Sequence, residues 1–295
     1  PRPELADHME KELEPIIETL AKNQWSFRIH ATYNESIGRF LDIFQKVDQK
    51  YPFLNKVRWI IDHAETISDE NLIRIKEMGG GIAIQHRMAY QAEYFIRRYG
   101  KAAAQARPPL RTMLKMGLPI GGGTDGTRVA SYHPWTCLWW LVTGKSVGGT
   151  IINDPENRLS REEALRLWTK GSAWFSGEDG TKGELSVGQL ADFAVLDNDY
   201  FTIDEDAIRG IESVMTVMDG RIVYSKDEFA AQDPDLPPVS PDWSPVKQYG
   251  GYHNSHTKAE PGTDHHHNHQ HTPGHSHWVM GADGRAWQTG CNCSV

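Results

Sequence analysis

The sequence predicts an α/β fold made of four consecutive strand–helix units of a barrel, followed by a β-rich module and a tail. Four short apolar runs each end at or near a polar residue, and these residues are His30, His63, His86 and Asp125. Successive members of this set are 33, 23 and 39 positions apart. These intervals bracket the roughly thirty residues of a βαβ unit. Amphipathic stretches separate the runs, which is typical of parallel strands joined by crossover helices.

The first unit is a strand that ends near His30 and a helix over residues 35–50. Apolar side chains in that helix recur at the spacing of one helix face: Ile37, Phe40, Leu41, Phe44 and Val47. This face should therefore pack on the sheet. Tyr51-Pro52 ends the helix.

The second and third units follow the same order. A buried strand is predicted over residues 56–62, and a helix over Ser68–Met78, with the serine as N-cap and a glycine run after it. The third strand is predicted over residues 81–85 and is tipped by His86. Its helix is predicted over residues 88–99.

The fourth unit is bounded by proline and glycine. Pro108-Pro109 opens a helix that stops at Gly117. A short strand over residues 118–121 then leads into the glycine-rich turn that holds Asp125. An apolar, tryptophan-dense helix is predicted over residues 134–143, and its aromatic side chains are more typical of a core than of a substrate pocket.

The pattern beyond this point becomes β-rich. The stretch Ser160-Arg-Glu-Glu163 is a capping box that opens a helix running to about Lys170. Strands are predicted over residues 189–196 and 213–224. Asp219-Gly220 divides the second of these with a type I′ hairpin turn. A β-rich region after a βα region implies a second module.

The segment from Gln232 onward is predicted to be a flexible tail. It is rich in proline, at Pro234, Pro237, Pro238, Pro241 and Pro245, and in histidine, at His265–His271 and His275–His277. Such low-complexity sequence does not favour regular structure. Its clustered imidazoles could bind Ni²⁺, Zn²⁺ or Cu²⁺, although without fixed geometry.

Composition excludes several function classes. The 295 residues carry a formal net charge of −8, and no segment supplies the concentrated Lys/Arg surface that nucleic-acid binding needs. No run approaches the roughly 20 apolar residues of a membrane helix. Three cysteines are too few for a disulfide scaffold or a four-ligand zinc site. No signal peptide opens the chain, so the cytoplasm is favoured, although an export signal could lie upstream.

Three of the strand-tip residues indicate metal chemistry. Imidazole and carboxylate groups are ligands for Zn²⁺ and similar ions, and the carboxyl ends of parallel strands meet on one face. His30, His63 and Asp125 are therefore the candidate ligands, and Asp125 could also take a proton from metal-activated water. Each residue alone also fits a structural role, since a strand-end histidine can be a hydrogen-bonded polar residue and Gly-Gly-Thr-Asp-Gly can be an Asx turn.

Four short motifs and the β-rich segment then carry a family resemblance. The motifs are Ile29-His30-Ala31, Asp62-His63-Ala64-Glu65, Ala83-Ile84-Gln85-His86 and Gly123-Thr124-Asp125, and the resemblance continues through Ser160–Ala164, Gly183–Asp197 and Val217–Tyr224. Over about residues 20–225 the chain resembles the C-terminal half of the amidohydrolase superfamily. The branch is amidohydrolase-3, which includes N-substituted formamide deformylases and related deacylases.

The resemblance implies a fold and a set of roles. It makes residues 1–177 the C-terminal half of a (β/α)₈ barrel (strands five to eight), residues 178–231 part of a composite β-sandwich, and residues 232–295 a disordered His-rich tail. It makes His30, His63 and Asp125 ligands of one or two divalent ions, most simply zinc, and Asp125 the proton shuttle. His86 matches no ligand of the family and is placed near the substrate, a small amide-type molecule. Homo-oligomerisation is left open.

The chain also departs from that family. Relatives carry a His-x-His pair on strand one and usually a carboxylate or carbamylated lysine on strand four, and neither lies at a strand tip here. We therefore expect a fragment of a longer enzyme that cleaves carbon–nitrogen bonds other than peptide bonds. Two alternatives stay open: a noncatalytic metal-binding protein that uses its His-rich tail, and an inactive structural fragment.

Overall fold

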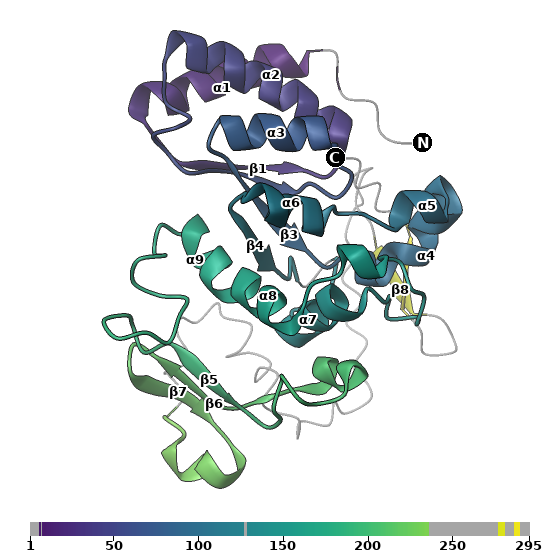
Figure 1. Cartoon of the computed structure of the whole chain (residues 1–295), viewed down its shortest axis with the longest axis vertical. Helices are drawn as coiled ribbons and strands as arrows, with labels where there is room; N and C mark the ends of the chain where they lie inside the picture. The colour runs from purple at the N-terminus through teal and green to yellow at the C-terminus, as the bar shows by residue number, and fades with distance from the viewer. Residues whose placement is uncertain (1–5, 7, 127–128, 236–276, 281–285, 290–295) are drawn as a thin grey trace, which may run out of the picture. The chain divides into compact units, whose positions relative to one another are not determined.

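The computed structural model describes residues 6, 8–126 and 129–235, and two further strands at 277–280 and 286–289. The chain divides into two compact units, residues 5–234 and residues 1–4 with 235–295. The larger unit holds most of the described residues (Figure 1). None of the helices in the described ranges has the length and apolar character that a membrane span requires.

The first part of the larger unit is a four-stranded parallel sheet. Its strands lie in sequence order: β1 (Phe27–Ala31), β2 (Trp59–His63), β3 (Gly81–Gln85) and β4 (Ile120–Gly123). The predicted parallel α/β fold is confirmed, with β3 at the predicted bounds. β2 starts later than expected because the backbone N–H groups of Lys56 and Val57 donate to the Phe53 carbonyl in a turn. β4 starts later because Pro119 has no N–H for the ladder.

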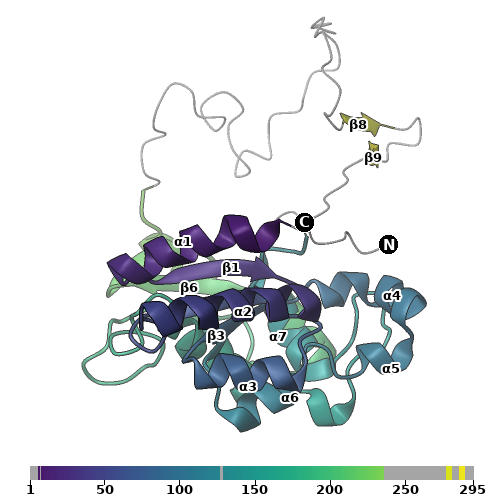
Figure 2. The ribbon, with the colours of Figure 1, turned by 90° about the horizontal axis from the view of Figure 1, so that it is seen from above.

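Helices follow the strands, and those after β1 and β2 cover one face of the sheet (Figure 1). They are α2 (Asn34–Lys50), α3 (Asp69–Glu77), α4 (Met88–Tyr99) and α6 (Leu110–Met116), with α1 (Met9–Asn23) beside α2. The short α5 (Lys101–Ala104), which was not predicted, lies against α4 at one edge of the unit (Figure 2). The predicted cap is confirmed, since the Ser68 hydroxyl accepts from the Asn71 N–H at 3.3 Å.

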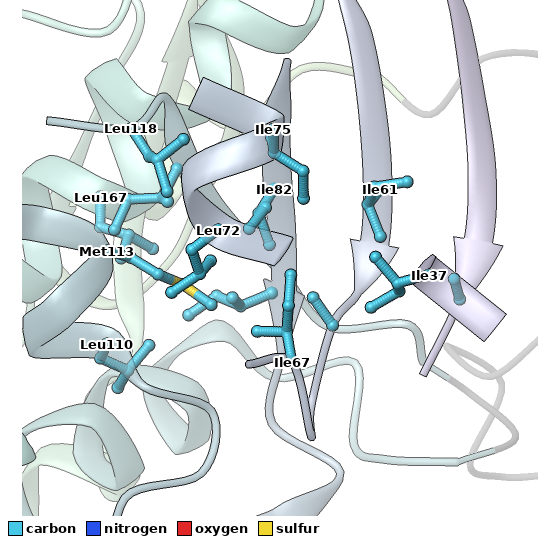
Figure 3. Close-up of a cluster of buried hydrophobic side chains, with 14 of the residues drawn as sticks. Ile37, Ile61, Ile67, Leu72, Ile75, Ile82, Leu110, Met113, Leu118 and Leu167 are labelled. Atoms are coloured by element: carbon cyan, nitrogen blue, oxygen red, sulfur yellow. The ribbon is translucent and has the colours of Figure 1, made fainter. Parts of the chain in front are cut away.

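The core lies between the sheet and these helices. In Figure 3, Ile61 and Ile82 of the sheet meet Ile37, Leu72 and Ile75 from α2 and α3. All five side chains are fully buried. Because side chains alternate along a strand, His30 and Asp62, next to Ile29 and Ile61, lie on the opposite face of the sheet. That face carries the candidate site.

A second group of helices lies between this sheet and a smaller one (Figure 1). It comprises α7 (Pro134–Thr143), α8 (Arg161–Arg166), a π-helical stretch η2 (Leu167–Gly171) and α9 (Ser172–Phe175). The capping box at Ser160 and Glu163 is confirmed, but helical structure continues past the expected end at Lys170. This helical stretch lies so close to β4 that only a glycine fits at position 171. A Cβ added there would lie 2.2 Å from the Ile120 carbonyl oxygen.

The smaller sheet is antiparallel, with β5 (Phe193–Leu196), β6 (Ser213–Met218) and β7 (Arg221–Ser225) in that order. The predicted hairpin is confirmed, since Asp219 and Gly220 both have the positive φ of a type I′ turn. β5 is shorter than predicted because the Leu190 N–H donates to Thr181 and the Asp192 N–H closes a turn. The remaining short helices are η1 (Pro155–Asn157), η3 (Glu205–Gly210) and η4 (Asp227–Gln232). The composite sandwich stays a prediction.

The C-terminal segment corrects the expectation of a wholly irregular tail. It contains an antiparallel pair, β8 (His277–Met280) and β9 (Ala286–Thr289). The missed signal is the apolar run Trp278-Val279-Met280, separated from Trp287 by the turn-forming pair Asp283-Gly284. The His265–His271 cluster and His275 lie outside the described residues, and so do most of the prolines.

Candidate active site

The three predicted ligands lie together in one pocket. On the sheet face opposite α2 and α3, a pocket of about 410 Å³ is lined by His30, His63 and Asp125. The other lining residues are Arg28, Asp62, Ala83, Ile84, Gln85, Gly122, Gly123, Ser172 and Phe175. The three residues lie at or just after the carboxyl ends of β1, β2 and β4. They meet because β1 to β4 are neighbours in one parallel sheet, so their carboxyl ends lie at the same edge.

The imidazoles and the carboxylate are close neighbours. The ring centroids of His30 and His63 are 4.4 Å apart at an interplanar angle of 68°. Nε2 of His63 lies 4.0 Å from Oδ2 of Asp125. The His63 side chain is nearly buried, whereas the Asp125 side chain is 48% exposed. The site thus pairs an enclosed imidazole with an accessible carboxylate.

Burial favours the neutral form of His63. Burial lowers the pKa of His63, and the neighbouring His30 imidazole lowers it further, against the opposing charges of Asp125, Glu65 and Asp62. Nδ1 of His63 is buried and has no hydrogen-bond partner in the described part of the chain. A neutral imidazole with a free nitrogen is the form that binds a metal.

The donor types fit a divalent metal, but the described residues do not complete its coordination. Two imidazoles and one carboxylate match the ligand chemistry of a catalytic zinc site. Within the ranges that the structure describes, no three His, Cys, Asp or Glu side chains form a group that could hold an ion. The assignment of His30, His63 and Asp125 as metal ligands therefore stays a prediction.

The pocket also contains an ion pair that sequence reasoning missed. Arg28 NH2 donates to Asp62 Oδ1 at 2.6 Å and Arg28 Nε to Asp62 Oδ2 at 3.3 Å. Period-two alternation could have revealed both residues, since Arg28 shares a strand face with His30. Ser172 and Phe175 carried no such signal, because they reach the pocket from α9, far along the chain.

His86 lies apart from the other predicted site residues. It does not line the pocket of His30, His63 and Asp125. Its side chain is fully buried, 5.7 Å from the Tyr90 ring between centroids. Neither of its ring nitrogens has a hydrogen-bond partner among the described residues. Burial lowers the pKa of His86 to about 4, so it is neutral near pH 7.

The buried imidazole of His86 should make folding stability depend on pH. Its pKa of about 4 in the folded chain lies below the ordinary value of about 6.5, so the unfolded chain binds the extra proton between these values. The free energy of unfolding should therefore fall as pH drops from about 6.5 to 4, by up to about 3 kcal/mol. Urea unfolding of the wild type and of His86→Leu at pH 7.5 and pH 4.5 measures this fall in the free energy of unfolding. We expect the free energy of unfolding to fall less in the variant than in the wild type. An equal fall in both would contradict a lowered pKa of His86 as the cause.

Most of the chain is similar in sequence to known proteins. The amidohydrolase family matches residues 2–224. The Bacillus subtilis protein named "Putative amidohydrolase YtcJ" is 27% identical over 223 residues, which are 74% of this chain and 41% of that protein. N-substituted formamide deformylase of Arthrobacter pascens is 27% identical over 118 residues, 40% of this chain and 21% of that protein.

Solved structures share the fold. An uncharacterized metal-dependent hydrolase from Pyrococcus furiosus aligns with a TM-score of 0.54 and 26% identity over 65% of this chain and 38% of that one. Atrazine chlorohydrolase TrzN from Arthrobacter aurescens, solved with zinc, aligns with a TM-score of 0.53 and 20% identity over 77% of this chain and 49% of that one. The chain spans about two fifths of the length of YtcJ. With residues 2–224 matched, the chain belongs to the amidohydrolase family.

Proposed function

We propose that this chain is part of a metal-dependent hydrolase that cleaves the carbon–nitrogen bond of small amide-type molecules. The observation that carries the proposal is the meeting of His30, His63 and Asp125 in one pocket at the carboxyl ends of parallel strands. Membership of the amidohydrolase family supports the reaction class. The names of the matched formamide deformylase and metal-dependent hydrolases agree with it.

Each residue has a role that its surroundings support. His30, His63 and Asp125 would hold a divalent ion, most simply Zn²⁺, the two histidines through neutral imidazole nitrogens. When bound, such an ion would lower the pKa of a water molecule to about 7 and so would supply a nucleophile. The exposed Asp125 carboxylate can accept the proton that this water loses and deliver it to the leaving nitrogen. The water oxygen would first bond to the carbonyl carbon, and the carbon–nitrogen bond would then break as the nitrogen takes the proton, which leaves a carboxylic acid and an amine.

The test uses the protein at its natural full length with its metal content measured. We expect the zinc-loaded protein to hydrolyse members of a panel of N-formyl amines, N-acyl amino acids and cyclic amides. A chelator should abolish turnover, and added Zn²⁺ should restore it. A protein of confirmed metal content that hydrolyses no member of the panel would refute the proposal.

A further inference from the structure

The backbone that presents His63 is in a conformation that residues with a side chain rarely adopt. His63 has φ +81° and Ala64 has φ +49°, both in the left-handed region that favours glycine. Two consecutive such residues persist only where the surrounding structure determines them, and they cluster at functional sites. His63 is the most enclosed of the three candidate ligands, so the direction of its ring depends on this turn.

One side of the turn is tied to β1 through the main chain. The Ala64 N–H donates to the Ala31 carbonyl at 3.0 Å, and the Thr66 N–H donates to the Thr32 carbonyl at 3.2 Å. These bonds continue the β1–β2 ladder past its last paired residues. They hold positions 64 and 66, but position 65 between them needs another anchor.

That anchor comes from the side of β3, through the Glu65 side chain. Its carboxylate, only 3% exposed, accepts from Gln85 Nε2 and from Arg87 Nε, each at 2.9 Å. Arg87 NH2 donates to the other carboxylate oxygen, and the Arg87 backbone N–H donates to Gln85 Oε1. We call Glu65, Gln85 and Arg87 the Glu65 clamp. Gln85 also lines the pocket beside His63.

A clamp of this kind specifies geometry more than it stabilises the fold. Taking a carboxylate and a guanidinium out of water costs free energy that their attraction only partly returns, so apolar residues of similar volume would often serve stability equally well. A bidentate arginine fork, in contrast, fixes direction as well as distance. Here the fork of Arg87 fixes the position of Glu65, which is two residues after His63.

We propose that the Glu65 clamp is a positioning device that holds the left-handed His63–Ala64 turn and so aims the His63 imidazole at His30 and Asp125. The proposal rests on the proposed function only for the role of His63. Glu65 and Arg87 contact no reacting atom and act through the turn. An ion pair with a merely structural role would instead stabilise the whole unit evenly.

The test is amide hydrogen exchange in the Arg87→Met variant. If the clamp holds the turn, exchange at the Ala64 and Thr66 amides rises at least tenfold while amides within β3 and α2 change little. Arg111→Met is the matched control, because Arg111 makes a comparable two-bond pair with Glu163, at 2.6 and 3.1 Å, away from the pocket. The control should leave Ala64 and Thr66 unchanged.

A second substitution distinguishes positioning from bulk stability. Ala64→Gly removes the penalty of the left-handed conformation, so adding Arg87→Met to that variant should raise exchange at Thr66 less than it does in the wild-type background. If Arg87→Met does not fold, the near-isosteric Glu65→Gln takes its place.

Two outcomes would overturn the inference. One is an unchanged exchange rate at both amides, and the other is an equal rise throughout the unit with no rescue by Ala64→Gly. Neither readout requires turnover. A full-length protein that hydrolyses nothing while the clamp variant loosens the turn would therefore contradict the proposed function alone.

Discussion

Asp125→Asn should lower kcat/KM of the zinc-loaded, full-length protein by at least about 100-fold, the lower end of what a general acid–base group contributes. The physical reason is that an amide side chain cannot take up the proton that water loses, and it is also a weaker metal ligand. Asp125 is the carboxylate within 4.0 Å of His63 Nε2, and its side chain is half exposed to the pocket. It is therefore placed to meet both water and substrate.

Steady-state kinetics with metal content measured for each variant tests this expectation. Asp42→Asn is the control, because Asp42 is a largely exposed carboxylate whose partner is Arg74 on the surface, and such pairs contribute little to stability. We expect the control to keep wild-type kcat/KM. If Asp125→Asn retained its zinc and lost less than tenfold in kcat/KM, Asp125 would not be the proton shuttle.

Gly121→Val should lower the free energy of unfolding by more than about 3 kcal/mol, at the upper end of the cost of overpacking. A Cβ at Gly121 would lie 2.2 Å from Cε2 of the Phe175 ring and 2.9 Å from the carbonyl carbon of Gly171. Even if the Phe175 ring moved, the Gly171 backbone would still be in the way. The melting temperature should fall by roughly 6–12 °C.

Gly123→Val in the same strand provides the matched control. A Cβ there would meet nothing within 4 Å, and valine suits a strand, so stability should change by less than about 1 kcal/mol. Urea unfolding and thermal melts of both variants measure the difference. Equal losses for the two variants would show that α9 does not pack on β4 as described.

Elements whose determinants are local could be predicted from the sequence. The N-cap at Ser68, the capping box at Ser160 and the hairpin at Asp219-Gly220 each depend on residues within four positions of one another. The parallel order of β1 to β4 followed from regularly spaced apolar runs. Because parallel strands align their carboxyl ends, the same spacing also predicted that His30, His63 and Asp125 would meet.

Features that depend on distant partners could not be predicted. Phe175 contacts Gly121 from a helix more than fifty positions later in the chain, and no local sequence pattern predicts that contact. The burial of His86 follows from packing around β3 and α4, although its place after a strand made it resemble the other candidates. The Glu65 clamp joins the ends of β2 and β3, which only the register of the folded sheet brings together.

The sequence by itself determined the order and type of the main elements, the family, and the three residues that share the pocket. These follow from periodicity and from residue chemistry at strand ends, which act over short stretches of chain. Only the tertiary structure decided that His63 is enclosed, that His86 lies outside the pocket, and that the left-handed turn at His63 and Ala64 stands next to the buried Glu65 clamp. Burial, charge and backbone strain at a site are set by groups that the fold brings together from distant parts of the chain.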